Sequence, residues 1–215
     1  MCLQNVQVLK IDMTQDYLPV VDRAVQVLAR GGTVVFPTDT LYGLGCNALD
    51  AHAACRVFDI KHRSYVKAMP MLVRDLSWAR ELAYVTPDQE RIISVFWPGK
   101  VTFVLPRRDI VPAIMCGGGQ TVGVRSPDNP FVQSLLQHFG YPLAGTSANI
   151  SGHEPHHDPQ IIAAAFRLSA PQPNLMLDAG LLPPSEPSTV VDLSGRQPRI
   201  LRQGAVRADK ILALL

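Results

Sequence analysis

A group of hydroxyl and carboxyl side chains follows one of the apolar stretches of the chain. Thr33-Val-Val-Phe36 is a short β-branched run that Pro37 interrupts, and the next residues are Thr38, Asp39 and Thr40. Side chains at the end of a buried strand are well placed to hold a ligand, but these residue types also satisfy their own backbone in tight turns. The spacing of a Walker phosphate-binding loop is absent. The segment predicts either a ligand-binding loop or a self-contained turn.

Two cations, Lys61 and Arg63, flank His62 at the end of an expected helix. Ammonium and guanidinium groups bind phosphate and carboxylate oxygens well, which indicates a clamp for an anion. The same charges would also complement the negative end of a helix dipole. Both interpretations are open from the local pattern, and His62 is interpreted as a surface residue.

A second apolar run opens into hydroxyls and an amide in the segment Pro142-Leu-Ala-Gly-Thr-Ser-Ala-Asn-Ile-Ser-Gly152. Ser147 lacks the GxSxG elbow of serine hydrolases, and no His or Asp is placed to complete a triad. Hydrogen bonding of Ser147 and Asn149 to a ligand is therefore the better functional hypothesis. A capped turn is the structural alternative.

Further polar groups lie at the ends of other expected strands. Arg125 ends the run that begins at Thr121, Arg202 precedes a Gln-Gly pair, and Ser188 opens a strand after a proline-rich loop. Three histidines between residues 153 and 157 lie in a loop without a matching carboxylate set, and the four cysteines form no CxxC pair. No metal site is predicted from these spacings.

Strand and helix patterns alternate along the chain, which predicts one α/β (α+β) domain over residues 1–215. Helices are expected over residues 17–28, after the cap Asp50, over 88–97, 130–139 and 160–168, and at the C-terminus. Strands are expected over residues 6–11, 33–36, 69–73, 101–105, 121–125, 142–145, 175–177, 189–193 and 199–202.

The composition is that of a globular protein with a sizeable core. Hydrophobic residues make up 47% of the 215, charged residues 18%, and the net charge is +2. A charge so close to neutral gives little attraction to nucleic acid or to a membrane surface. The absence of a signal peptide and of a stretch of about 20 apolar residues predicts a cytoplasmic protein without a membrane span.

Six segments occur in one order along the chain: GGTVVFPTDTLYGLGC, KHRSYVKAMPMLV, WPGKVTFVL, TVGVRSPDNP, PLAGTSANISG and PSTVVDL with RILRQGA. Together, from about Gly31 to Ala205, they resemble the YrdC-like threonylcarbamoyl-AMP synthase family in its short, single-domain form. Six ordered blocks over nearly the whole chain make this a very specific resemblance.

The resemblance implies a twisted mixed sheet with flanking helices around a large, positively lined cavity. It also implies a nucleotidyltransferase, an L-threonylcarbamoyladenylate synthase, that converts L-threonine, bicarbonate and ATP into threonylcarbamoyl-AMP and pyrophosphate. Mg²⁺ is expected to accompany the ATP. The product would pass to the tRNA threonylcarbamoyl transferase machinery, which makes N6-threonylcarbamoyladenosine (t6A) at position 37 of tRNA.

The family's Lys-x-Arg and Ser-x-Asn signature falls on four residues of this sequence, and the resemblance implies that they are catalytic: Lys61, Arg63, Ser147 and Asn149. By the same resemblance, the residues expected to bind ATP are Lys61, Arg63, Thr121, Asn149 and Arg202. Those expected to bind threonine are Thr38, Arg125, Ser147 and Ser188. The role of Asp39 is left open between support of Mg²⁺ and orientation of a proton.

The sequence departs from the family pattern at His62 and Ser64, where the clamp usually has Gly and Pro, and at Glu186, where Gly is common. Two rival hypotheses are retained. The first is an RNA-binding module with the same fold, although a near-neutral charge and 7% aromatic residues allow only a weak contact with RNA. The second is a paralogue that handles another carbamoyl-type substrate, which the intact clamp disfavours.

Overall fold

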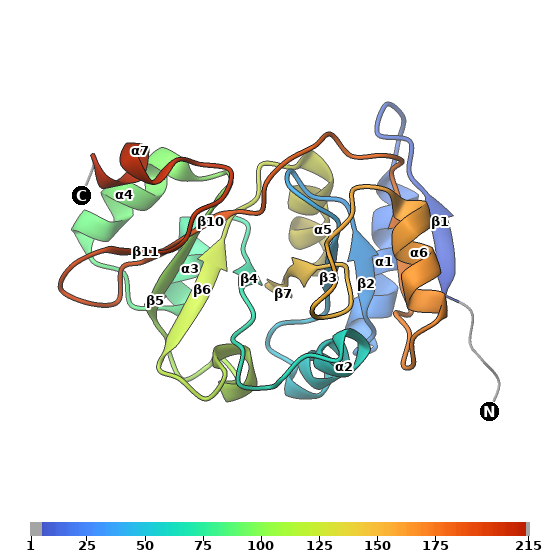
Figure 1. The fold of residues 1–215 in the computed structure, drawn as a ribbon, viewed down its shortest axis with the longest axis horizontal. Helices are drawn as coiled ribbons and strands as arrows, with labels where there is room; N and C mark the ends of the chain where they lie inside the picture. Colours follow the sequence, from blue (N-terminus) through green and yellow to red (C-terminus); the bar gives the residue numbers. More distant parts are fainter. Residues whose placement is uncertain (1–5, 214–215) are drawn as a thin grey trace.

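The computed structural model describes residues 6–213 and contains two mixed β-sheets rather than the single sheet expected (Figure 1). The first sheet has five strands in the order β1-β9-β2-β3-β8. Their bounds are β1 Gln7–Lys10, β9 Leu175–Asp178, β2 Val34–Phe36, β3 Gly43–Gly45 and β8 Thr146–Ser147. The first three run parallel, and β3 is antiparallel to both β2 and β8.

The second sheet has six strands in the order β11-β10-β5-β6-β4-β7. Parallel pairs (β10 with β5, β6 with β4) alternate with antiparallel pairs. The strands are β11 Arg199–Arg202, β10 Thr189–Asp192, β5 Val101–Pro106, β6 Thr121–Arg125, β4 Met71–Leu72 and β7 Leu143–Ala144. The mixed α/β class predicted from the sequence is confirmed.

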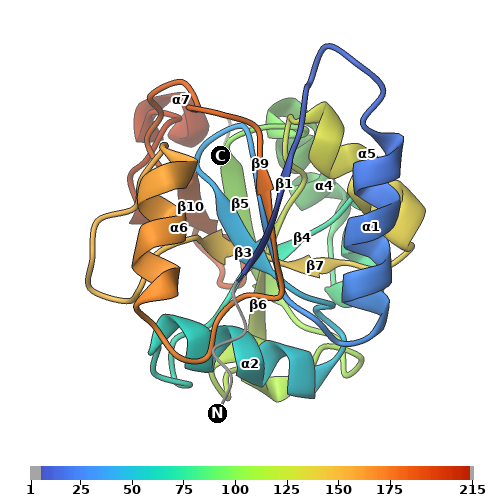
Figure 2. The same cartoon turned by 90° about the vertical axis from the view of Figure 1, so that its right-hand side faces the viewer.

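Seven α-helices and one 3₁₀ turn accompany the sheets within residues 6–213. They are α1 Leu18–Ala29, α2 Ala51–Lys61, α3 Leu76–Leu82, α4 Pro87–Phe96, the turn η1 Ala113–Cys116, α5 Pro130–Phe139, α6 Pro159–Arg167 and α7 Ala208–Leu212. In Figure 2, α1 and α5 lie on one side of the first sheet and α6 lies on the other. None of these helices is long and apolar enough to cross a membrane.

The chain passes from the second sheet to the first at Gly145, between β7 and β8. Gly145 N donates to Pro70 O at 2.9 Å, and a Cβ at this position would lie 2.7 Å from Leu72 Cγ. Gly45 in β3 is equally constrained, because a Cβ there would lie 2.1 Å from Ala144 O. Glycine therefore allows the two sheets to approach closely here, and this junction positions the segment that contains Ser147.

The main hydrophobic core extends between the two sheets and α2. It includes Leu44 from the first sheet, Phe103 from the second and Phe58 from α2, each with no exposed surface. A second cluster lies between the first sheet, α1 and α5. Cys46 and Cys116 are buried and Cys55 is half-buried, all as free thiols, whereas Cys2 lies outside the described residues. The strands of the two sheets are thus held in place by two well-packed hydrophobic clusters.

Candidate active site

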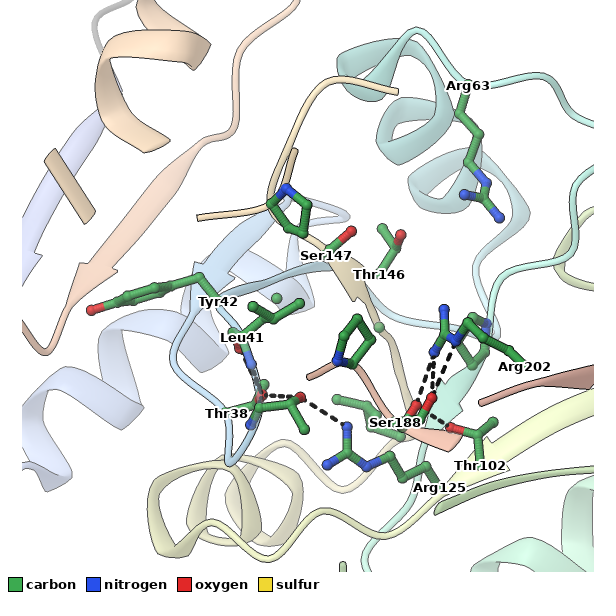
Figure 3. Close-up of a pocket in the computed structure, with 17 residues that line it drawn as sticks. Thr38, Leu41, Tyr42, Arg63, Thr102, Arg125, Thr146, Ser147, Ser188 and Arg202 are labelled. Atoms are coloured by element: carbon green, nitrogen blue, oxygen red, sulfur yellow. Dashed lines mark hydrogen bonds between the residues drawn. The ribbon is translucent and has the colours of Figure 1, made fainter. Parts of the chain in front are cut away.

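A cavity of ≈ 200 Å³ lies where strand ends and loops from both sheets meet (Figure 3). Leu41, Pro70 and Leu72 supply part of its apolar wall. A cavity with an apolar wall and a few convergent polar groups is typical of a small-molecule site. The polar side chains that line it are Thr38, Thr40, Tyr42, Arg63, Thr102, Arg125, Thr146, Ser147, Ser188 and Arg202.

The lining is positively charged, because it contains three arginines and no carboxylate. Burial lowers the pKa of Arg63, Arg125 and Arg202 from its ordinary value, but arginine stays charged at neutral pH. Within residues 6–213, only Arg125 of the three has a carboxylate partner. Arg63 is half-buried and Arg202 is exposed, and the guanidinium of each donates to uncharged oxygens, an arrangement that favours binding of an anion.

Lys61 lies beneath the Ser-x-Asn loop and not in the cavity lining. Its side chain is 2% exposed, and Nζ donates to Ser147 O, to Asn149 O at 2.7 Å and to Asn149 Oδ1 at 3.2 Å. These bonds use all three donors of the ammonium group. Burial and the charge of Arg63 lower the pKa of Lys61 to about 7. In this geometry, Lys61 fixes the loop that presents Ser147 to the cavity.

Arg63 reaches the cavity because α2 ends in a left-handed turn. Asp50 caps the start of the helix by accepting from two backbone N–H groups, and at the other end Arg63 N donates to Phe58 O at 2.9 Å. The residue between the two cations, His62, has φ 51°. The guanidinium of Arg63 then donates to Ala68 O at 2.7 Å and points into the cavity (Figure 3).

The hydroxyl of Ser147 and the amide of Asn149 bond to each other. Ser147 Oγ donates to Asn149 Oδ1 at 2.6 Å, while Asn149 Nδ2 donates to Ile150 O and to His153 O. The donor of Ser147 is used, but its oxygen can still accept a hydrogen bond from a ligand. Ser147 lines the cavity, and Asn149 lies behind it with Lys61.

Arg125 is the most buried of the three arginines that line the cavity. Its side chain is 7% exposed, and Nη2 donates to Asp39 Oδ1 at 2.6 Å in a buried ion pair. Nε donates to Gly99 O at 2.8 Å, and Nη1 donates to Thr40 Oγ1 at 3.2 Å. Burial acts to lower the pKa of Arg125, and the carboxylate of Asp39 opposes that effect. The guanidinium is therefore held by partners on three sides.

Another part of the cavity wall is a hydrogen-bonded group that contains Ser188, Thr102 and Arg202. Ser188 Oγ lies 2.9 Å from Thr102 Oγ1, and Arg202 donates to Ser188 O at 2.8 Å. Sequence reasoning missed Thr102, although it is a lone hydroxyl in an apolar strand.

Thr38 Oγ1 donates to Leu41 O at 2.6 Å and also accepts from backbone N–H groups. The hydroxyl of Thr38 therefore serves mainly to shape its own loop.

Six of the predicted residues line one cavity: Thr38, Arg63, Arg125, Ser147, Ser188 and Arg202. Lys61 and Asn149 support it from behind. Thr121 lies outside the lining, although it shares with Arg125 the face of β6 opposite the buried Val122 and Val124. A ligand would have to extend along β6 to reach it, and its contact with a nucleotide stays a prediction. Among residues 6–213, no three His, Cys, Asp or Glu side chains form a cluster that could hold a metal ion.

The chain matches a known protein family over most of its length. The Sua5/YciO/YrdC family model, which is described as "Telomere recombination", matches residues 26–204. This match covers most of the chain and all of the cavity lining. The chain belongs to the Sua5/YciO/YrdC family.

Two proteins of this family show the extent of the similarity. Threonylcarbamoyl-AMP synthase of Pyrococcus abyssi is 34% identical over 189 residues, which cover 87% of this chain and 55% of that protein. The crystal structure of P. abyssi Sua5 complexed with L-threonine has a TM-score of 0.88 at 30% identity and covers 98% of this chain and 60% of that one. Escherichia coli YciO has a TM-score of 0.85 at 31% identity, with 96% and 98% covered. The chain thus spans little more than half of the Pyrococcus protein.

The left-handed turn between the two cations is formed by His62, which has φ 51°. Histidine is one of the residue types that tolerate the left-handed region better than most.

Proposed function

We propose that this chain is an L-threonylcarbamoyladenylate synthase. The observation that carries the proposal is one cavity that arginines from three segments line together with Ser147, in the fold of a protein whose structure is complexed with L-threonine. Relatives from the same family are called threonylcarbamoyl-AMP synthase, at moderate identity over most of this chain.

The chemistry suits a site that is lined by arginines and in which the Ser147 hydroxyl donates to the amide oxygen of Asn149 and not to a general base. The amine of threonine captures CO₂ derived from bicarbonate and becomes a carbamate. A carbamate oxygen then attacks the α-phosphorus of ATP, and pyrophosphate leaves. Negative charge develops on the phosphoryl oxygens and on the leaving group, so positioned cations supply most of the rate enhancement.

The residues divide between the two substrates according to their position. Arg125, with Ser147 and Ser188 nearby, is assigned to threonine, and its guanidinium to the carboxylate. Arg63 and Arg202 are assigned to the phosphates of ATP, because neither is paired with a carboxylate among residues 6–213. The cavity of ≈ 200 Å³ suits an amino acid. ATP would extend beyond it, because larger ligands occupy roughly 300–1,000 Å³.

Mg²⁺ is assigned to ATP as part of the substrate. The lining has no carboxylate, and Asp39 already pairs with Arg125, so the described residues offer no set of protein ligands for a resident ion. The product would serve the tRNA threonylcarbamoyl transferase machinery that makes t6A at position 37, and a cytoplasmic location follows from that role.

Pyrophosphate release tests the proposal. Purified protein is supplied with MgATP, L-threonine and bicarbonate, and each component is then omitted in turn. Release that requires all three supports the synthase. Pyrophosphate release that does not require threonine would contradict the synthase and favour a paralogue with another substrate. Tight, steeply salt-dependent RNA binding without turnover would favour an RNA-binding module.

A further inference from the structure

We propose that Asp39 is a positioning residue that orients the guanidinium of Arg125 for the carboxylate of the amino-acid substrate. The inference rests on the proposed function and deepens it. Asp39 would act through Arg125 and would not touch the substrate itself. A residue 86 positions away in sequence thus determines how well the cavity recognises a carboxylate.

The hydrogen bonds of Arg125 leave a defined part of the guanidinium unused. A guanidinium has five N–H donors. Gly99 O, Thr40 Oγ1 and Asp39 Oδ1 each accept one, at 2.8, 3.2 and 2.6 Å from the donor nitrogen. Each terminal nitrogen therefore keeps one N–H group. Two N–H groups are the number that a carboxylate accepts when arginine binds it in a fork.

Asp39 is placed to hold Arg125 and not to meet the ligand. Its side chain is 7% exposed and lines a neighbouring cavity of ≈ 410 Å³, beside Lys100 and Asn129. It does not line the cavity that contains Arg125. Its second oxygen accepts from Asp128 N at 3.3 Å, which ties the carboxylate to the turn before α5. The Asp39 side chain is thus itself fixed on two sides.

The charge of Asp39 has a second effect on the same group. Burying the Arg125 guanidinium alone would be costly, and a carboxylate at 2.6 Å offsets part of that cost. The Arg125–Asp39 ion pair is close to neutral as a unit. Recognition of the substrate carboxylate therefore depends on the direction of the two remaining N–H groups of Arg125 more than on attraction between net charges. Loss of the Asp39 oxygen would allow the guanidinium to rotate away from the fork geometry.

The test compares two substitutions with two ligands. Asp39→Asn keeps an oxygen acceptor for Arg125 and removes the charge, whereas Asp39→Ala removes both. The ligands are L-threonine and L-threoninamide, which lacks the carboxylate. Dissociation constants are measured by isothermal titration calorimetry, and KM for threonine and for ATP is measured by pyrophosphate release. Urea unfolding of each variant reports whether the fold is kept.

We expect Asp39→Ala to raise the dissociation constant for L-threonine by roughly 10- to 100-fold. The KM for ATP and kcat should change little. L-threoninamide should bind equally well to wild type and variant, and Asp39→Asn should keep most of the affinity for threonine.

An equal loss of affinity for both ligands, or an unchanged threonine KM in Asp39→Ala, would overturn the positioning role. If Asp39→Ala fails to fold, the Asp39→Asn variant decides, because loss of threonine affinity there without loss for the amide contradicts the acceptor role. A wild-type protein that binds threonine without releasing pyrophosphate would defeat the proposed function and leave this test intact.

Discussion

Lys61→Met replaces a buried ammonium by an apolar side chain of similar length. The wild-type ammonium is 2% exposed and bonds only to uncharged oxygens of residues 147 and 149. Methionine would fill the same volume but leave two buried carbonyl oxygens without this donor. We expect the Ser-x-Asn loop to lose its fixed geometry and pyrophosphate release to fall by roughly 100-fold or more.

The effect on stability has a defined pH dependence. Burial lowers the pKa of Lys61 from 10.5 to about 7 in the folded chain. Between these values the unfolded chain binds a proton that the folded chain does not, so the wild-type stability rises with pH through this window. Each pH unit contributes about 1.36 kcal/mol. From pH 7 to pH 10 the wild type should gain on the order of 4 kcal/mol over Lys61→Met, which has no group to titrate.

Urea unfolding of both proteins at pH 7, 8, 9 and 10 measures this difference. Lys67→Met is the matched control, because it makes the same substitution at an exposed lysine. A stability gap between wild type and Lys61→Met that grows with pH supports a pKa of Lys61 that burial lowers in the folded chain. Two parallel curves of stability against pH would contradict a lowered pKa of Lys61, because Lys61 would then titrate alike in the folded and unfolded states.

Three further predictions concern the cavity and the contact between the sheets. Arg63→Ala should reduce pyrophosphate release by roughly 100-fold or more and leave urea unfolding nearly unchanged, because Arg63 bonds only to carbonyls of its own loop; normal kinetics would remove it from the site. Serine should have a kcat/KM about 5- to 10-fold below that of threonine in a competition assay, for the loss of one methyl contact; equal values would contradict an apolar contact there. Gly45→Ala should not yield soluble protein that unfolds cooperatively, because its Cβ would lie 2.1 Å from the carbonyl oxygen of Ala144. The control is Gly195→Ala, whose Cβ would have no atom nearer than 3.9 Å. This control should unfold as the wild type does in a thermal melt.

Elements with a strong periodic pattern could be predicted from the sequence. Pro130–Phe139 and Thr121–Arg125 have the bounds that periodicity and flanking residues predict, and Asp50 caps α2 as expected. The short strands β3 and β8 were not predicted, nor was α3. Gly43–Gly45 has no strand propensity of its own and pairs only because β2 and β8 lie on either side of it.

The site was predictable as a set of segments but not as a geometry. The motifs place Arg63, Arg125 and Ser147 together, and they do line one cavity. The sequence does not reveal that Lys61 lies behind the Ser-x-Asn loop, since this depends on a helix end in one segment and a sheet junction in another. The pairing of Asp39 with Arg125 is equally hidden, because it joins residues that only the packing of the two sheets brings together.

In the proposed reaction, this cavity joins a carbamate of threonine to the adenylyl group of ATP. The most direct measurement is mass spectrometry of the nucleotide products after incubation with MgATP, L-threonine and ¹³C-bicarbonate. We expect an adenylate that contains threonine and one labelled carbon, formed with pyrophosphate. An unlabelled threonyl-adenylate, or hydrolysis of ATP without incorporation of threonine, would contradict it.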